Sequence, residues 1–210
     1  MSLLEEIATA VFEGDADKVK EASERALSDG AAPETVINEG LITGMNKIGY
    51  LFKNGEVYVP EVLIAARAMH AGMDVLKSSL QAGEEIGNKG IVLVGTVKGD
   101  LHDIGKNLVA MMIEGAGYKV VDLGIDVAPD KFIKAVEEYQ PLAVGLSALL
   151  TTTMTAMQET VSRIKGNGGR VRVIVGGAPI TQKFADAIGA DAYAPDAASA
   201  ADIINQILAG

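Results

Sequence analysis

The sequence predicts an all-α four-helix bundle over residues 1–82, followed by an α/β domain with a five-stranded parallel sheet over residues 91–210. Three observations support this division. Apolar residues recur at helical spacing in the first part, whereas short apolar runs rich in β-branched residues alternate with helical stretches in the second. Between them lies the polar segment QAGEEIGNKG, which has three glycines, and we place a linker at 83–90.

The first part contains residues that favour the start or the end of a helix. They comprise a capping box, an N-cap aspartate, two first-turn prolines and two turn-forming glycines. In chain order these residues are Ser2 with Glu5, Asp15, Gly30, Pro33, Asn54-Gly55 and Pro60. They delimit four helices joined by short turns, which is typical of an antiparallel bundle.

Strand and helix patterns alternate five times in the second part. The expected strands lie at 91–97, 119–124, 141–147, 170–177 and 191–194. The expected helices lie near 104–116, 129–139, 153–165, 181–188 and 197–208. This alternation predicts a parallel sheet covered by helices on both faces, of the flavodoxin-like (Rossmann-like) kind. Such sheets bind their ligands in the loops that follow the carboxyl ends of the strands.

Composition excludes several classes of function. The 210 residues carry a formal net charge of −10, which disfavours nucleic acid and anionic membranes as partners because both require a basic surface. Cysteine is absent, so disulfides and thiolate metal sites are excluded. The N-terminus lacks the basic region of a signal peptide, and no apolar run approaches the roughly 20 residues that span a bilayer. We therefore expect a cytoplasmic protein.

The loop after the first expected strand, KGDLHDIGKN at 98–107, carries the strongest chemical signal. It does not fit a phosphate-binding P-loop, because Asn107 stands where a serine or threonine would bind magnesium. His102 is a candidate metal ligand, with Asp100 placed to hold the other ring nitrogen. Two plainer interpretations remain: a histidine in a loop is often only solvated, and Asp100 could simply cap the turn. A single histidine cannot form an all-protein zinc or iron site, so most of the coordination would come from a macrocycle.

Three short motifs occur together at characteristic distances. Asp100-x-His102-x-x-Gly105 is followed after 41 residues by Ser147-x-Leu149 and after 26 more by Gly176-Gly177. This combination resembles the B12-binding module shared by methionine synthase and the small corrinoid proteins. The helical part resembles the cap domain that accompanies this module in methyl-transferring members, so the resemblance covers essentially the whole chain.

The resemblance implies a cobamide cofactor, which is cobalamin or a related corrinoid in the methylated or the hydroxo/aquo form. It implies base-off binding, with His102 as the lower cobalt ligand and Ser147 bonded to the base of the nucleotide tail. The hydroxyl that bonds the ligand-holding aspartate is serine in methionine synthase and Thr153 here. The residues expected to bind the cofactor are Asp100, His102, Gly105, Ser147, Leu149, Thr151, Thr153, Gly176 and Gly177, and none is expected to be catalytic.

The resemblance also implies a methyl carrier of the methanol, methylamine or methoxyarene methyltransferase systems. We expect a non-catalytic corrinoid subunit that serves two partners, a donor-specific methyltransferase and a second methyltransferase that passes the methyl group to an acceptor. We expect Val59, Val62 and Leu63 of the fourth helix to cover the upper face of the cofactor, with the linker as a hinge. The alternatives are a B12-dependent sensor or regulatory module and the small subunit of an adenosylcobalamin mutase.

Overall fold

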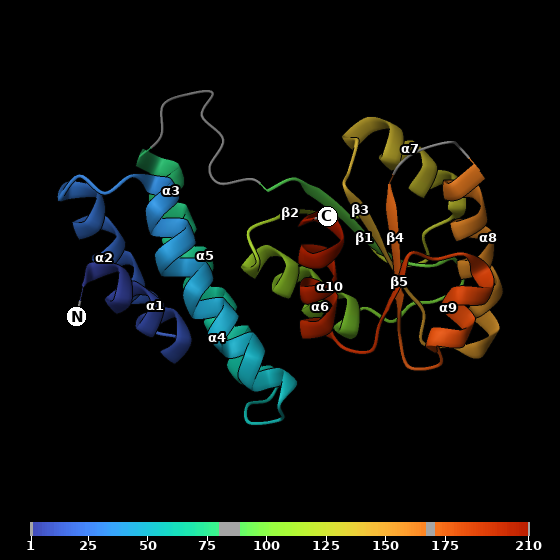
Figure 1. Cartoon of the computed structure of the whole chain (residues 1–210), viewed down its shortest axis with the longest axis horizontal. Coiled ribbons are helices and arrows are strands. Elements are labelled where there is room, and N and C mark those ends of the chain that lie inside the picture. The colour runs from blue at the N-terminus through green and yellow to red at the C-terminus, as the bar shows by residue number, and fades with distance from the viewer. Residues whose placement is uncertain (1, 80–88, 167–170, 210) are drawn as a thin grey trace. The chain divides into compact units, whose positions relative to one another are not determined.

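The computed structural model describes residues 2–79, 89–166 and 171–209 (Figure 1). The chain divides into two compact units: Met1–Lys89 with Glu114–Tyr118, and Gly90–Ile113 with Lys119–Gly210. We call them the helical unit and the sheet unit. Residues 83–88 of the predicted linker lie outside the described residues, so the linker boundaries and the hinge stay predictions.

The helical unit is a bundle in which α1 packs against α2 and α4, and α5 packs against the same two helices. Its elements are α1 (Leu3–Glu13), α2 (Ala16–Ser28), α3 (Pro33–Thr35), a π-helix (Val36–Leu41), α4 (Ile42–Lys53) and α5 (Val59–Ser79). The predicted capping box is present: Ser2 Oγ accepts from the Glu5 N–H at 3.2 Å, and Glu5 Oε2 accepts from the Ser2 N–H at 2.7 Å. The Asp15 side chain caps α2 as expected.

Two features of this unit differ from the expectation. The predicted third helix contains a π-helical stretch, where Gly40 lets α1 approach closely, because a Cβ there would lie 2.9 Å from Ile7 Cγ2. Val62 was expected to face the cofactor, but it is fully buried, whereas Leu63 is 41% exposed. The prediction for Val62 is therefore wrong, because a fully buried side chain has no surface to offer to a ligand.

The sheet unit contains the five parallel strands that were predicted, and their order is β2-β1-β3-β4-β5. The strands are β1 (Ile91–Thr96), β2 (Lys119–Asp122), β3 (Ala143–Ser147), β4 (Arg172–Gly176) and β5 (Ala192–Ala194). The helices are α6 (Ile104–Gly115), α7 (Pro129–Tyr139), α8 (Met154–Gly166), α9 (Gln182–Ile188) and α10 (Ala197–Ala209), and a 3₁₀ turn (Thr151–Thr153) precedes α8.

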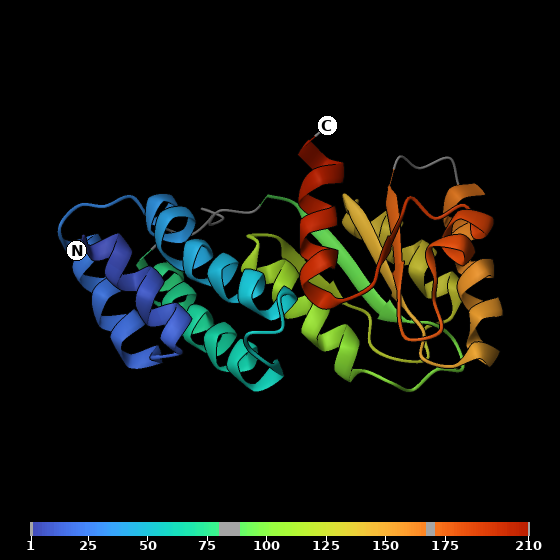
Figure 2. The ribbon, with the colours of Figure 1, turned by 60° about the horizontal axis from the view of Figure 1, so that its bottom comes forward.

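Helices cover both faces of this sheet (Figures 1 and 2): α6 and α10 lie on one side, and α7, α8 and α9 on the other. On the second side, Val144 and Val173 of the strands pack with Phe132 of α7 and Met157 of α8, all fully buried. Buried β-branched residues on central strands are what a sheet covered on both faces requires.

The strand order places a topological switch point between β1 and β3. The chain leaves β1 toward α6 on one face, and it leaves the neighbouring β3 toward α8 on the other face. Ligands of open α/β sheets bind at such a point, where the two loops diverge. The register aligns Thr96, Ser147 and Gly176 at the ends of adjacent strands, so the predicted motifs meet at this edge.

Within the described residues, no helix combines the length and the apolar character needed to cross a membrane.

Candidate functional site

The loop between β1 and α6 begins with a tight turn. The Asp100 N–H donates to the Val97 carbonyl at 3.1 Å, and Gly99 within the turn has a φ of 82°. A positive φ costs glycine little because glycine has no Cβ. The turn reverses the chain after β1, and the Asp100 side chain that follows it is fully buried.

Both carboxylate oxygens of Asp100 accept hydrogen bonds. Oδ1 accepts from the His102 N–H at 3.2 Å and faces His102 Nδ1 at 2.9 Å. Oδ2 accepts from the Leu149 N–H at 2.7 Å and from the Leu150 N–H at 3.2 Å. Thr153 Oγ1 lies 2.8 Å from the same oxygen. The β1–α6 and β3–α8 loops therefore meet at a single carboxylate.

These bonds keep Asp100 ionised. Burial by itself raises the pKa of Asp100, but the bonds from the Leu149 N–H, the Thr153 hydroxyl and His102 outweigh it and hold the pKa well below its ordinary range. An ionised carboxylate only accepts hydrogen bonds, so His102 Nδ1 carries the ring hydrogen. In the neutral form of the ring Nε2 then has the lone pair, on a side chain that is 53% exposed. A neutral imidazole held in this way is suited to ligate a metal.

The backbone of His102 is fixed from the end of β1. Thr96 is fully buried, and its hydroxyl donates to the His102 carbonyl at 2.8 Å. Thr96 was not predicted as a site residue, although a hydroxyl residue that ends an otherwise apolar strand was a usable signal. The Leu150 N–H was also missed, since every residue but proline has an N–H and no sequence pattern marks this one.

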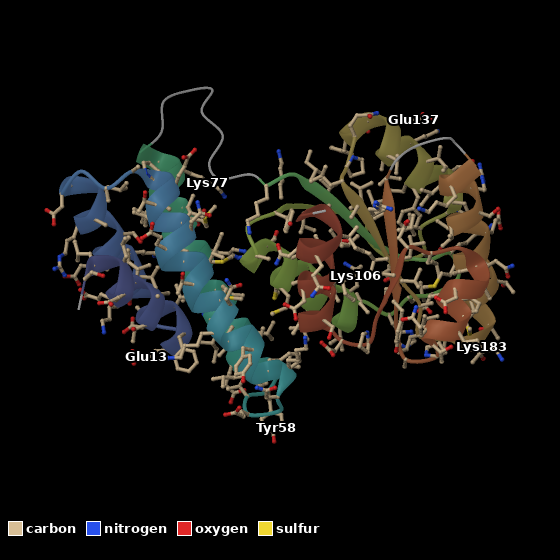
Figure 3. The ribbon with its side chains drawn as sticks, viewed as in Figure 1. Glu13, Tyr58, Lys77, Lys106, Glu137 and Lys183 are labelled. Carbon is tan, nitrogen blue, oxygen red and sulfur yellow. The ribbon has the colours of Figure 1, made fainter. Side chains whose placement is uncertain are left out.

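The start of α6 is anchored to the end of β2 by Lys106, which is labelled in Figure 3 and only 4% exposed. Its ammonium donates to Asn107 Oδ1 at 2.7 Å and forms an ion pair with Asp122. A buried lysine is rarely found without such partners. The helix that follows His102 is thereby held against the sheet edge.

The remaining predicted residues lie at the same edge in different settings. Ser147 is half-buried at the end of β3, and Gly105 is exposed in the first turn of α6. Thr151 is exposed in the 3₁₀ turn, and its side chain is not among the groups bonded to Asp100 in the described residues. Gly176 is half-buried at the end of β4, in register with Ser147. Their part in cofactor binding stays a prediction.

Gly177 has no room for a side chain. Its φ is 125°, and a Cβ there would lie 1.8 Å from the Ala148 carbonyl oxygen. Ala148 immediately precedes Leu149, whose N–H binds Asp100. The glycine therefore lets the β4–α9 loop pass directly against the backbone that holds the carboxylate.

Exposed apolar side chains occur in the segments that follow β1, β2 and β3. They are Leu101 (67% exposed), Ile104 (79%), Ile125 (42%), Leu149 (41%) and Leu150 (41%). Of these only Leu149 was predicted as a site residue. An exposed apolar group of this kind marks a binding surface. Within the described ranges no three His, Cys, Asp or Glu side chains group to hold a metal ion, so one imidazole amid apolar side chains fits a metal carried in a flat macrocycle.

The chain matches the family described as B12 binding domain over residues 90–203, and a second B12 binding domain over residues 3–77. It is 41% identical over 210 residues to dimethylamine corrinoid protein 2 of Methanosarcina acetivorans, covering 99% of this chain and 97% of the relative. Trimethylamine corrinoid protein 1 of the same organism is 40% identical over 203 residues, covering 95% of this chain and 93% of the relative.

Two solved structures resemble the whole chain. A chain of the methanol:cobalamin methyltransferase complex from Methanosarcina barkeri has a TM-score of 0.90 at 35% identity, covering 99% of this chain and 80% of that chain. A cobalamin-binding protein from Desulfitobacterium hafniense has a TM-score of 0.80 at 33% identity, covering 100% of this chain and 99% of that chain.

Proposed function

This chain belongs to the family of B12-binding corrinoid proteins, and we propose that it carries a methyl group between two methyltransferases, one specific for the methyl donor and one that serves the acceptor. The observation that carries the proposal is the buried Asp100, which faces Nδ1 of the half-exposed His102 at 2.9 Å. The relatives named above for dimethylamine, trimethylamine and methanol support a small methylated donor.

His102 Nε2 is the proposed lower ligand of the cobalt, with the cobamide bound base-off. Ser147 and Gly176-Gly177 are the proposed contacts of the nucleotide tail, because they lie side by side at the ends of β3 and β4. When bound, the corrinoid supplies a cobalt centre that accepts a methyl group from one substrate and releases it to another. The residues of this chain orient that centre and adjust its electronic properties.

Asp100 acts on the ligand through hydrogen-bond chemistry. By accepting from Nδ1, the carboxylate fixes the tautomer that leaves Nε2 free and makes the imidazole a stronger donor to metal. The Leu149 N–H and the Thr153 hydroxyl keep Asp100 ionised, so they support the ligand indirectly. The exposed apolar side chains of Leu101 and Ile104 are the proposed apolar contacts of the bound corrinoid.

A carrier is favoured over the two alternatives. A sensor or regulatory module usually brings a DNA-binding or signalling domain, whereas the two B12 binding domain matches already account for residues 3–77 and 90–203. The small subunit of an adenosylcobalamin mutase would share the sheet unit but would not need a helical bundle of this kind. The relative named for dimethylamine aligns over 99% of this chain, which includes the bundle. The similarity to the methanol:cobalamin methyltransferase complex also covers 99% of the chain.

The first test is cofactor binding and ligation. The full chain is reconstituted with hydroxocobalamin and passed through gel filtration, and we expect one cobalt per chain with a visible corrin spectrum. In the cobalt(II) form, electron paramagnetic resonance should show nitrogen coupling that His102→Ala removes. The matched control is His70→Ala, since His70 lies on α5 in the helical unit. A colourless protein would refute cofactor binding, and coupling that survives in His102→Ala would refute the ligand assignment.

The second test separates a carrier from an enzyme. The reduced holoprotein is mixed with methanol or a methylamine, alone and with a cognate methyltransferase, and methyl transfer is followed in the visible spectrum. We expect transfer only when the methyltransferase is present. Rapid transfer from the free donor to the isolated chain would refute the carrier role.

A further inference from the structure

The β2–α7 loop contains an insertion beside the candidate site. Val94 pairs with Asp122, but further along the same two segments Val97 pairs with Val127, so the offset between partners rises from 28 to 30. The Thr96 N–H donates to the Gly124 carbonyl at 3.0 Å, and the Thr96 carbonyl accepts from the Val127 N–H at 2.9 Å. Two residues, Ile125 and Asp126, therefore bulge out between these bonds. Bulges commonly lie on edge strands beside functional sites, where they redirect a side chain.

Asp126 in this bulge has a left-handed backbone, with a φ of 51°. Such a conformation is unfavourable for a residue with a Cβ, although aspartate and asparagine tolerate it better than most. A strained residue persists only where its surroundings hold it in place, and strain of this kind concentrates near functional sites. The contacts of Asp126 therefore indicate what its strained conformation achieves.

Those contacts all reach the turn that carries Asp100. The Asp126 N–H donates to the Asp100 carbonyl at 3.0 Å, and Asp126 Oδ1 accepts from the Gly99 N–H at 2.7 Å. One residue thus holds the Gly99–Asp100 dipeptide at both ends. Both bonds are made by a residue with a left-handed φ.

We propose that Asp126 is a positioning residue for His102, because it clamps the turn that presents the Asp100 carboxylate to the imidazole. The chain of contacts runs from Asp126 to the Gly99–Asp100 backbone and from Asp100 Oδ1 to His102 Nδ1. The proposal rests on the proposed function only in taking His102 as the cobalt ligand. The effect of Asp126 on the His102 imidazole is expected in the protein without cofactor as well.

Three substitutions separate the two properties of Asp126. Asp126→Asn retains an acceptor oxygen and the tolerance of a left-handed φ, Asp126→Gly retains only the backbone freedom, and Asp126→Ala loses both. The matched control is Gln140→Ala, because Gln140 also has a left-handed φ of 46° but lies at the C-terminal end of α7. If Asp126→Ala and Gln140→Ala changed the tautomer ratio of the His102 ring equally, the change would come from backbone strain alone.

The decisive measurement is made on the full chain without corrinoid. Nitrogen-15 chemical shifts of the His102 ring give the ratio of the Nδ1–H to the Nε2–H tautomer, and the Gly99 amide shift reports its bond to Asp126. We expect Asp126→Ala to lower the tautomer ratio roughly tenfold, the equivalent of one hydrogen bond with a charged acceptor. Asp126→Gly should have an intermediate ratio, and Asp126→Asn and Gln140→Ala should stay close to the native one.

A native tautomer ratio in Asp126→Ala would overturn the proposal, whether or not the Gly99 amide shift changes. An equally large fall in the His102 tautomer ratio of Gln140→Ala would also overturn the proposal, because the fall would then be caused by backbone strain in general. In the hydroxocobalamin-loaded cobalt(II) protein, the fraction of molecules with nitrogen coupling should fall in the same order of variants. If the native chain binds no corrinoid, the proposed function fails, but the tautomer ratio still decides the role of Asp126.

Discussion

Two aspartates at opposite edges of the same sheet show two ways to keep a carboxylate ionised: the side chain of Asp100 is fully buried, and that of Asp191 is 17% exposed. Asp100 follows β1 at the carboxyl edge, and Asp191 precedes β5 at the amino edge. Burial raises the pKa of each, and in each case hydrogen bonds outweigh burial, so that both pKa values lie below the ordinary range. The two sites differ in the groups that provide those bonds.

At the amino edge, cations compensate the charge. Asp191 forms an ion pair with the Lys165 ammonium and lies 3.4 Å from a guanidinium nitrogen of Arg172, and it also accepts from the Val173 N–H at 2.6 Å. At the carboxyl edge, the bonds that the structure gives to Asp100 come from backbone N–H groups, a hydroxyl and an imidazole. The side chains of Lys165 and Arg172 compensate the charge of Asp191. The carboxylate of Asp100 instead faces the His102 imidazole.

This difference shows how a structural carboxylate is distinguished from one that acts on a ligand. A salt bridge neutralises the charge and fixes the ends of secondary structure elements. Neutral donors stabilise the ionised form without placing a second formal charge beside it. The position of Asp100 at the switch point and that of Asp191 at the opposite edge agree with these two roles.

The largest effect is expected from adding a methyl group at the carboxyl edge. Gly177→Ala places a Cβ 1.8 Å from the Ala148 carbonyl oxygen, which must shift together with the Leu149 N–H that binds Asp100. We expect a loss of about 3 kcal/mol or more in the free energy of unfolding, measured by urea denaturation. The control at the amino edge is Gly189→Ala, which has a φ of 75° but open space around the Cβ. It should lose only about 1–2 kcal/mol, and equal losses would show that the close contact is unimportant.

A moderate effect is expected from replacing each of the two aspartates by asparagine, which removes the charge and keeps the shape of the side chain. Asp100→Asn can present an N–H₂ to His102 Nδ1, which favours the tautomer with hydrogen on Nε2 and so blocks the proposed ligand. We expect a loss of about 1–3 kcal/mol in unfolding free energy, because buried donors lose their acceptor. Corrinoid affinity, followed by the visible spectrum during titration, should fall on the order of 10–100-fold. Asp191→Asn should leave that affinity unchanged, and a comparable loss in Asp191→Asn would break the distinction between the two edges.

The smallest effect is expected when the salt concentration is raised and the pKa values of Asp100 and Asp191 are compared. Both pKa values are lowered in the folded protein, so each carboxylate stabilises the fold above the ordinary aspartate value of about 3.9, and this stability is lost as the pH falls below that value. Higher salt screens the partly exposed ion pairs of Asp191 and should raise its pKa toward the ordinary value. The carboxyl carbon shift of Asp100 should show no such change before acid unfolding. A salt response of equal size at both residues would show that their partners do not differ in kind.

Much of the fold follows from local patterns that the sequence displays directly. The capping box of Ser2 and Glu5 acts over three residues, and the wholly apolar, β-branched strands alternate with helices along the chain. The π-helical stretch at Val36–Leu41 was not predicted, because the residues around Gly40 have the spacing of an ordinary helix. The burial of Val62 differs from the expected cofactor contact, since periodicity places a residue on an apolar stripe of a helix but does not give the neighbour that covers it.

The sequence by itself determined the pair at the centre of the site, because Asp100 and His102 are two residues apart in one loop and their chemistry is complementary. The resemblance of short motifs added Thr153, 53 positions beyond Asp100, which the structure places at hydrogen-bond distance. Only the tertiary structure decided which backbone N–H groups reach the carboxylate and that Asp126 clamps the turn beneath it. Backbone groups are the same in every residue but proline, and the two-residue bulge depends on the register between strands, so neither leaves a pattern that can be read along the chain.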